Sequence, residues 1–176
     1  MVEILKYNDD NLRDDEIDEV VTKVRAFVIS SKLNLMIGKD KDGFHLIEAN
    51  VGPKEKLEEP LFKSLYDLTG ISLDGRDKYE PFFEVRYYSK NYFDQGYNRL
   101  SDTIYYLIYT DKMPNIKKLK LTERQLREKM RMEFIYRDNF KDELLEYIDS
   151  EKNIINQIKA KEILIAFDKL KEVYGF

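Results

Sequence analysis

Carboxylates, ammonium groups and guanidinium groups are the side chains of this sequence that are numerous enough to do chemistry. The 176 residues include 34 Asp and Glu, 30 Lys and Arg, one histidine and no cysteine. The absence of cysteine excludes a disulfide scaffold, a thiolate nucleophile and a zinc–thiolate site. The single histidine, His45, excludes any site that needs two imidazoles, and a Ser-His-acid relay would have to use it. His45 lies in the apolar run FHLI, which indicates a β-strand.

Length and composition indicate one soluble domain. The net charge is −4 and 43% of the residues are hydrophobic, enough for a single core. No apolar run approaches the roughly 20 residues of a membrane span, and the first ten residues are acidic where a signal peptide is basic. We therefore expect a cytoplasmic protein that does not enter a membrane.

The first half of the chain predicts strands followed by one helix. Residues 1–19 are rich in Asp and Glu and predict a solvated acidic arm or a short helix. The runs VVTKVRAFVIS, LNLMIGKD and FHLIEANV predict three strands joined by tight polar turns. In EEPLFKSLYDLTG the residues Leu61, Leu65 and Leu68 recur at helical spacing; Pro60 fits the first turn, and Gly70 fits the C-terminal cap.

The second half predicts two aromatic strands, a short basic helix, a strand and two helices. The aromatic strands are EPFFEVRYYSKNYF and LSDTIYYLIYT, and Thr122 with Gln125 is typical of a capping box. MRMEFIYR predicts one more strand, and the C-terminal helix has an apolar stripe of Ile155, Ile158, Ile165, Leu170 and Val173. The order indicates an α/β domain with helices packed on a central sheet, divided into an arm (1–19), a core domain (20–150) and a C-terminal helix on the same domain (151–176).

The segment FHLIEANVGPKEKLEEPLFKSLYDLTGISL resembles the Nudix box, so the chain resembles the Nudix hydrolase family over residues 20–137. The family pattern is Gly, five residues, Glu, seven residues, then Arg-Glu-hydrophobic-any-Glu-Glu-any-Gly-hydrophobic. Laid without gaps over residues 49–71, its specified positions fall in order on Ala49, Glu55, Lys63, Ser64, Leu65, Asp67, Leu68, Gly70 and Ile71.

This resemblance implies a fold and an activity. The fold would be a Nudix-like α/β/α sandwich with a central mixed sheet, here with extra C-terminal helices. The activity would be hydrolysis of a nucleoside diphosphate derivative with Mg²⁺ or Mn²⁺ as the cofactor.

Three positions of the box decide whether that chemistry is available. On a helix, residues 64, 67 and 68 project from one face, so three carboxylates there would converge on a single Mg²⁺ or Mn²⁺ ion. In this sequence Ser64 offers a neutral oxygen and Leu68 offers none, so Asp67 is the one carboxylate left. The box is therefore degenerate, and a lost general base typically costs about 10²- to 10⁴-fold in rate.

Two interpretations of the remaining acids stay open. Glu55 matches the first glutamate of the box, so Glu55 and Asp67 are the candidate metal pair. Alternatively, Glu59 and Asp67 lie four residues on either side of Lys63 and form surface ion pairs worth a few tenths of a kcal/mol, about 0.2–0.5 per pair. We expect the ion pairs.

The aromatic strand offers a candidate nucleotide surface. Alternation places Phe83, Val85 and Tyr87 on one face and Phe82, Glu84, Arg86 and Tyr88 on the other. The second face, with nearby Arg99, could stack a base and hold a phosphate, and Lys63 retains the charge of the family's arginine. The candidate substrate residues are therefore Lys63, Arg86, Tyr88 and Arg99. Packing under the C-terminal helices is the alternative for this face.

Two further segments bear on partners. Residues 116–134 have a local charge of +4, which predicts a solvated basic helix; nucleic-acid binding is not expected because the whole chain is negative. The C-terminal apolar stripe leaves a homodimer open.

We expect a Nudix-family protein that is weakly active or inactive as a hydrolase and acts as a nucleotide-binding or interaction module. The alternative is an active divergent hydrolase with a displaced base such as Glu48, Glu58 or Glu84.

Overall fold

The computed structural model describes residues 2–41 and 43–175, which form one eight-stranded sheet and four α-helices. The strands are β1 (Glu3–Tyr7), β2 (Glu19–Ile29), β3 (Asn34–Asp40), β4 (Gly43–His45), β5 (Ile47–Val51), β6 (Lys78–Ser89), β7 (Arg99–Tyr109) and β8 (Arg131–Tyr136). The helices are α1 (Glu58–Thr69), α2 (Glu123–Arg127), α3 (Arg137–Ser150) and α4 (Ile154–Tyr174). Short 3₁₀ turns lie at Asp14–Glu16, Tyr92–Asp94 and Ile116–Lys118.

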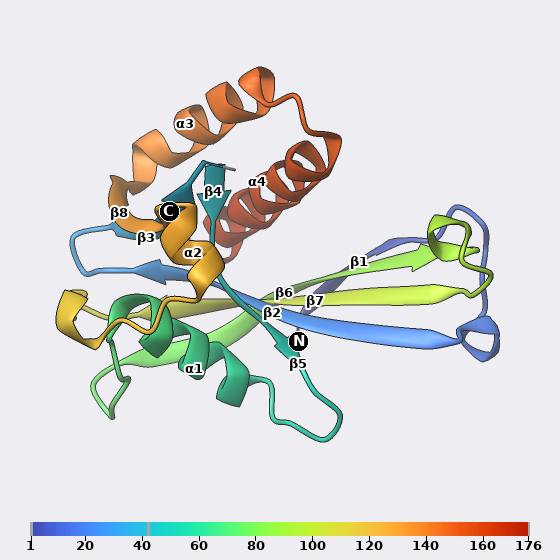
Figure 1. Cartoon of the computed structure of the whole chain (residues 1–176), viewed down its shortest axis with the longest axis horizontal. Helices are drawn as coiled ribbons and strands as arrows, with labels where there is room; N and C mark the ends of the chain where they lie inside the picture. The colour runs from blue at the N-terminus through green and yellow to red at the C-terminus, as the bar shows by residue number, and fades with distance from the viewer. Residues whose placement is uncertain (1, 42, 176) are drawn as a thin grey trace.

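The sheet is mixed and lies between two helical layers. Its order is β1-β6-β7-β2-β3-β4, with β5 also paired with β2 and β8 with β3. The pairs β1/β6 and β2/β7 are parallel and the other pairs are antiparallel. Helix α1 covers one face, and α3 and α4 cover the other (Figure 1). The predicted α/β/α arrangement with a central mixed sheet is confirmed.

Alternation along β2 divides the core into two. Val24, Ala26 and Val28 pack toward the leucines of α1. Phe27 and Ile29 pack toward α3 and α4, in a cluster that includes Phe140 and Phe167. Because successive strand residues point to opposite faces, one strand supplies both layers.

Helix α1 begins and ends as its sequence predicts. Leu61, Leu65 and Leu68 are buried against the sheet, and Pro60 lies in the first turn, where its missing N–H costs no helical hydrogen bond. Gly70 follows with φ 73°, and its N–H donates to the Tyr66 carbonyl at 2.7 Å. A side chain with a Cβ is strained in that left-handed conformation, so glycine is favoured there.

Helix α4 packs on the same core through a different stripe from the predicted one. Its buried residues are Ala160, Glu162, Ile163, Ala166, Phe167 and Leu170. Of the predicted stripe, Leu170 is buried, whereas Ile155, Ile158, Ile165 and Val173 are exposed. Ile155, Ile158 and Ile165 therefore lie on the outer face of α4. Within the described part of the chain, we find no helix with the length and apolar character of a membrane span.

The predicted acidic arm at residues 1–19 is wrong for its first segment. β1 adds to the sheet parallel to β6, from Glu3 opposite Phe83 to Tyr7 opposite Tyr87. The Tyr7 and Tyr87 rings stack with centroids 4.7 Å apart, and Leu5 packs on the core. The alternating run EILKY forms an edge strand, and the acidic residues that follow it form the connection to β2.

Two strand predictions also need correction. FHLIEANV forms two strands, because β4 pairs with β3 and β5 pairs with β2, with Leu46 between them. In β6 the register shifts between Pro81 and Phe83, so Phe82 joins the same core cluster as Phe83 and Val85. A β-bulge of this kind breaks the alternation on which the prediction for Phe82 depended.

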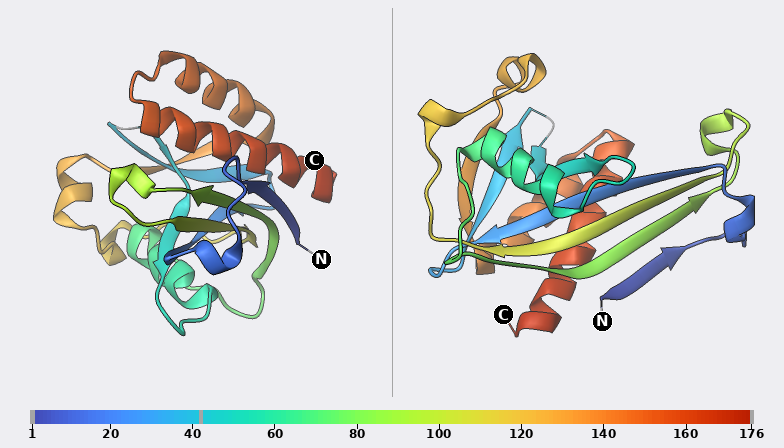
Figure 2. Two further views of the ribbon diagram at one scale, coloured as in Figure 1. Left: turned by 90° about the vertical axis from the view of Figure 1, so that its right-hand side faces the viewer. Right: turned by 90° about the horizontal axis from the view of Figure 1, so that it is seen from below.

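The strands β1, β2, β6 and β7 extend beyond the helical layers at one end of the molecule (Figures 1 and 2). We call this uncovered part the sheet arm. It comprises residues 3–7, 19–23, 86–103 and the turns between them. At the other end, the predicted capping box is present, because Thr122 and Gln125 exchange hydrogen bonds at the start of α2.

Candidate functional site

On the face of α1 that would carry the carboxylates of the Nudix box, Ser64 and Leu68 make contacts that hold the fold together. The Ser64 hydroxyl donates a hydrogen bond to the main-chain carbonyl of Glu48, 2.8 Å away in β5. Leu68 is 8% exposed and belongs to the core between α1 and the sheet. Two of the three positions that could hold a metal therefore connect α1 to the rest of the fold.

The two predicted metal ligands do not form a site. The Asp67 carboxylate forms an ion pair with Lys63, one turn earlier on α1. The Glu55 carboxylate accepts a hydrogen bond from the Gly52 N–H at 2.6 Å and closes its own loop. A cavity of about 220 Å³ beside α1 is lined by Lys63, Ser64 and Asp67 but not by Glu55.

This donor set does not fit Mg²⁺ or Mn²⁺. Such ions take carboxylate and carbonyl oxygens, and here one carboxylate is paired with an ammonium group. Among residues 2–41 and 43–175, no group of three or more His, Asp or Glu side chains is placed to hold a metal ion. The expected surface ion pair is present for Asp67.

A larger cavity of about 370 Å³ lies beside the same helix, and we call it the box cavity. It is lined by residues of strands β4 and β5 and of helices α1, α2 and α4. Its lining includes Ser64 and Leu68 of α1, His45 and Glu48 of β4 and β5, Arg124 and Gln125 of α2, and Lys159 of α4.

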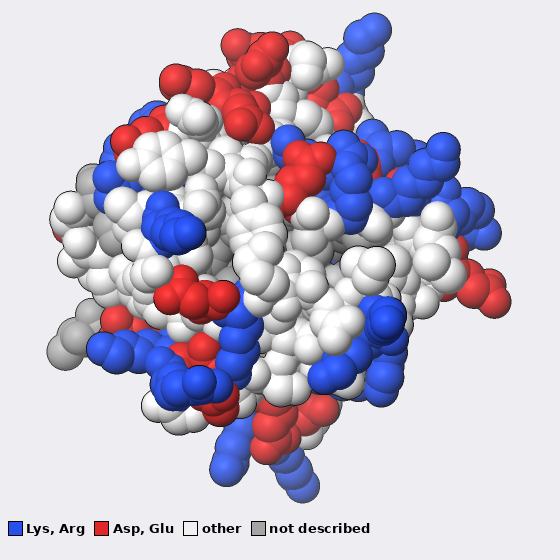
Figure 3. All heavy atoms as spheres, turned by 90° about the vertical axis from the view of Figure 1, so that its left-hand side faces the viewer, with Lys and Arg blue, Asp and Glu red and all other residues white. Residues whose placement is uncertain are grey.

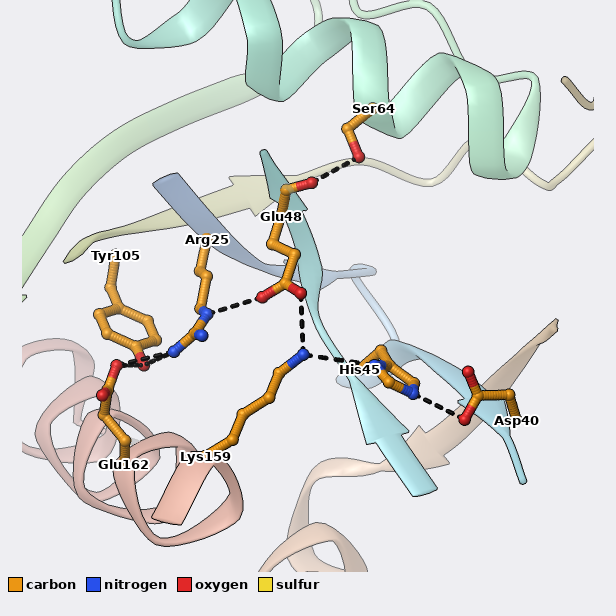
Figure 4. Close-up of polar contacts among 8 residues, drawn as sticks. All are labelled: Arg25, Asp40, His45, Glu48, Ser64, Tyr105, Lys159 and Glu162. Carbon is orange, nitrogen blue, oxygen red and sulfur yellow. Dashed lines mark hydrogen bonds and ion pairs between the residues drawn. The ribbon is translucent and has the colours of Figure 1, made fainter. Parts of the chain in front are cut away.

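Glu48 stands between two cations at the wall of this cavity (Figure 4). Its carboxylate lies 2.8 Å from Arg25 Nε and 2.8 Å from Lys159 Nζ. Burial alone would raise the pKa of Glu48, but Lys159 and Arg25 lower that pKa to about 2. The carboxylate is therefore ionised and neutralised at neutral pH, which makes it a poor proton acceptor.

Arg25 continues the network into the core. Its Nη1 donates to Glu162 Oε1 at 2.7 Å and to the Tyr105 hydroxyl at 3.0 Å, and Tyr105 donates to Glu162 at 2.6 Å. Burial would lower the pKa of Arg25, whereas Tyr105, Glu48 and Glu162 raise it above its ordinary value. The buried guanidinium is thus charged and paired, as a buried cation must be.

His45 extends the network on the other side. Lys159 Nζ lies 3.3 Å from His45 Nδ1, and His45 Nε2 lies 2.8 Å from Asp40 Oδ1. A lysine that donates to Nδ1 places the imidazole proton on Nε2, facing Asp40. His45 therefore connects a cation to a carboxylate in this network and does not hydrogen-bond a serine hydroxyl as a catalytic relay would require.

The predicted substrate residues do not share a site. Strand register places Arg86 opposite Asp102 and Arg99 opposite Ser89, so Arg99 lies on the other face of the sheet from Arg86. Arg86 is paired with Glu84, and the Tyr88 hydroxyl donates to Asp14 at 3.2 Å.

Arg99 and Lys63 also lie apart. Arg99 pairs with Glu19 at 2.9 Å, and its guanidinium lies 4.3 Å from the centroid of the Tyr92 ring. Lys63 is on α1, paired with Asp67. The predicted grouping of Arg86, Tyr88 and Arg99 on one surface is wrong. The pairing of β6 with β7 directs the side chains of Arg86 and Arg99 to opposite faces of the sheet.

The three candidate displaced bases all have partners. Glu48 is held by Arg25 and Lys159, Glu58 accepts a hydrogen bond from the Tyr106 hydroxyl at 2.9 Å, and Glu84 pairs with Arg86. Each carboxylate is therefore already used in a hydrogen bond or an ion pair within the fold.

The Arg25 network was missed by reasoning from sequence. Its signals are single charged residues inside apolar patterns: Arg25 in VVTKVRAFVIS and Glu162 on the buried face of α4. A charge buried in such a pattern predicts a partner, but it does not say which strand or helix supplies that partner.

The basic segment is solvent-exposed, as expected. Its cations Lys117, Lys118, Lys120, Arg124, Arg127, Lys129 and Arg131 are all exposed. Arg124 pairs with Glu128, and Arg131 pairs with Glu133. On the face shown in Figure 3, groups of both charges surround an uncharged centre, and Lys and Arg side chains gather at its upper right.

Comparisons with known proteins give structural similarity without sequence similarity. No protein-family model and no curated protein matches the chain. A solved structure of MutT, from work on the Aliivibrio salmonicida and Vibrio cholerae proteins, is 13% identical, with a TM-score of 0.49 over 82% of this chain and 96% of the other. DR0079 from Deinococcus radiodurans is 14% identical, with a TM-score of 0.49 over 81% of each chain. Dihydroneopterin triphosphate pyrophosphohydrolase from E. coli is 6% identical, with a TM-score of 0.48 over 82% of this chain and 95% of the other.

These three proteins are Nudix hydrolases. At these identities and TM-scores, the activity of this chain has to be argued from its own residues.

Proposed function

We propose that this protein is a nucleotide-binding protein of Nudix-like fold with little or no pyrophosphohydrolase activity. The observation that supports the proposal is the use of one helix face. Ser64 is bonded to the Glu48 carbonyl, Leu68 is in the core, and Asp67 is paired with Lys63. Of these three positions only Asp67 carries a carboxylate, and that carboxylate is paired with Lys63.

The expected loss of rate is large. Removing a general base alone typically costs about 10²- to 10⁴-fold. Glu48, an acid in the cavity wall, cannot replace it easily, because a carboxylate with a pKa of about 2 is a weak base. Turnover by this protein should therefore be at or near background.

The box cavity supports binding as the remaining role. At about 370 Å³ it is within the range of small-molecule sites, and its lining carries the cations Arg124 and Lys159 together with the acids Asp40, Glu48 and Glu128. Arg124 is paired with Glu128 and Lys159 with Glu48, so a nucleotide phosphate would share these cations with the two carboxylates. Binding through these cations does not depend on a divalent metal.

A titration tests the proposal without measuring turnover. Isothermal titration with MnCl₂ should show no saturable binding at millimolar concentrations, in the parent protein and in Asp67→Ala alike. ADP with EDTA present should bind, and Arg124→Ala should weaken it, whereas Arg127→Ala, an exposed arginine on the same helix that does not line the cavity, should not. Saturable Mn²⁺ binding that Asp67→Ala abolishes would overturn the proposal.

The homodimer and the absence of nucleic-acid binding stay predictions. Exposed Ile154, Ile155 and Ile158 at the start of α4 are compatible with a contact between copies.

A further inference from the structure

A second cavity lies on the sheet arm, on the face opposite α1, and we call it the arm pocket. Its volume is about 340 Å³, and it shares no lining residue with the box cavity. Arg25 and Glu162 form its inner wall, and Tyr92 and Arg99 lie toward its outer end.

Strand register explains why this part of the sheet is hollow. Ser101 of β7 lies between Tyr87 of β6 and Val21 of β2, and Thr103 lies between Val85 and Lys23. Ser101 is therefore smaller than the side chains on both sides of it, and Thr103 is much shorter than Lys23. One face of the Tyr87 ring is covered by Tyr7, at 4.7 Å between centroids.

The groups around this hollow are hydrogen-bond donors without partners in the described chain. Arg25 uses Nε for Glu48 and Nη1 for Glu162 and Tyr105, which leaves its Nη2 without a hydrogen bond to any described residue. Thr103 is 6% exposed, and its hydroxyl has no hydrogen bond to the described residues. The same is true of the Ser101 hydroxyl, the Asn50 amide and the Lys23 ammonium group, which all line the pocket.

Among the described residues, the buried side-chain atoms without a hydrogen-bond partner are Glu19 Oε2, Arg99 Nε and Asp102 Oδ1, and none of the donors above is one of them. These donors are therefore accessible to solvent. Arg25, Thr103, Ser101 and Lys23 all line the arm pocket. Donors that are accessible in a cavity can bind an acceptor from outside the chain without giving up a protein partner.

The acids nearby are already neutralised or point away. Glu162 accepts hydrogen bonds from Arg25 and Tyr105, and Glu19 is paired with Arg99. Asp102 is also a lining residue of the pocket, but strand alternation directs its side chain to the opposite face of β7, where its carboxylate lies 3.8 Å from Arg86. Arg25 is itself paired with Glu48 and Glu162, so the charge left for a ligand is that of Lys23, and Arg25 contributes its Nη2 as a hydrogen-bond donor.

We infer that the arm pocket binds a small molecule that carries an oxyanion, a phosphate or a carboxylate, next to a planar ring. The oxyanion accepts hydrogen bonds from Lys23, Thr103 and Arg25 Nη2, and the ring lies over Ser101 against Tyr87. Charge-assisted hydrogen bonds of this kind are the strong ones, and aromatic rings stack favourably. The inference does not depend on the proposed function, because the two cavities are separate.

Titration calorimetry with phenyl phosphate, benzoate and uncharged phenol tests this site in the full chain. Phenyl phosphate or benzoate should bind, the tighter of the two identifying the oxyanion, and phenol should bind at least about tenfold more weakly. Lys23→Gln and Thr103→Val should each weaken the anion about tenfold, and Ser101→Leu, which fills the hollow, should abolish binding. Lys161→Gln, an exposed lysine on α4, is the matched control and should bind like the parent.

Thermal unfolding of each variant separates loss of the site from loss of the fold, and Thr103→Val keeps the side-chain shape. The inference is overturned if neither anion binds at millimolar concentrations, if phenol binds as well as the anions, or if Lys23→Gln and Thr103→Val bind like the parent.

Discussion

The Ser64 hydroxyl donates a hydrogen bond to the main-chain carbonyl of Glu48 at 2.8 Å, and this contact joins α1 to β5 at the position where a metal-dependent hydrolase would place a carboxylate. The serine side chain is therefore part of the fold. Ser64→Ala should lower the free energy of unfolding by about 1 kcal/mol, because the main-chain carbonyl of Glu48 loses the hydrogen bond from the Ser64 hydroxyl. Urea denaturation followed by circular dichroism measures this, with exposed Ser150→Ala as a comparison.

Glu48→Gln should destabilise the protein more strongly, by about 3 kcal/mol at pH 7, because it leaves Arg25 and Lys159 without their carboxylate. Exposed Glu59→Gln on α1 should change the stability by less than about 0.5 kcal/mol. Equal losses in the two variants would contradict the role of the network.

The effect of Glu48→Gln should depend on pH in a specific direction. The pKa of Glu48 is lowered from 4.5 to about 2 in the folded protein, so its contribution is complete above pH 4.5 and is lost as the pH falls toward 2. The difference between parent and variant should therefore shrink over that range. A difference that stays constant down to pH 2 would show that Glu48 is not ionised by its partners.

Asp102→Asn should act in the opposite sense. Burial and then the nearby Glu84 carboxylate raise the pKa of Asp102 from 3.8 to about 6. An acid whose pKa is raised on folding costs stability when it is ionised, so removal of the charge should stabilise the protein at pH 8 by about 1 kcal/mol. The gain should vanish as the pH falls below 4.

The control for this prediction is Asp9→Asn, which is exposed in the turn after β1. Denaturant unfolding at pH 8 and pH 4 should show no change for Asp9→Asn at either pH. Destabilisation by Asp102→Asn at pH 8 would mean that the Arg86 ion pair outweighs burial and Glu84.

The predicted homodimer can be tested through the exposed end of α4. Ile154 and Ile155 are 63% and 65% exposed, so Ile155→Lys should leave the fold intact. If the parent sediments as a dimer, this variant should sediment as a monomer. A truncation before α4 is a poor alternative, because it removes Phe167 and Leu170 from the core.

Local sequence patterns predicted the elements that are defined by contacts between near neighbours or by a regular spacing of apolar residues. Helix α1 and its Gly70 cap, the Thr122 capping box and strand β8 are of this kind. Strand β1 was missed because its pairing with β6 connects residues about 80 positions apart, and its acidic neighbours dominate the local composition. The side of the sheet on which Phe82 lies depends on a bulge that alternation cannot show.

The site was less predictable than the fold. The degenerate positions 64 and 68 could be found by their residue types, and their consequence for metal binding follows from chemistry. The Arg25–Glu48–Lys159 network could not be found, because it joins strands β2 and β5 to helix α4 across more than 100 residues. The same long-range register separates Arg86 from Arg99.

Hydrolysis is the measurement that tests the central claim most directly. Purified protein is incubated with Mg²⁺ or Mn²⁺ and a panel of nucleoside diphosphate derivatives, alongside Asp67→Ala, Glu55→Ala and Ser64→Glu, which returns one carboxylate to α1 without disturbing the core at Leu68. We predict turnover at background for the parent and for the two alanine variants. Robust turnover by the parent that Asp67→Ala or Glu55→Ala abolishes would contradict the account.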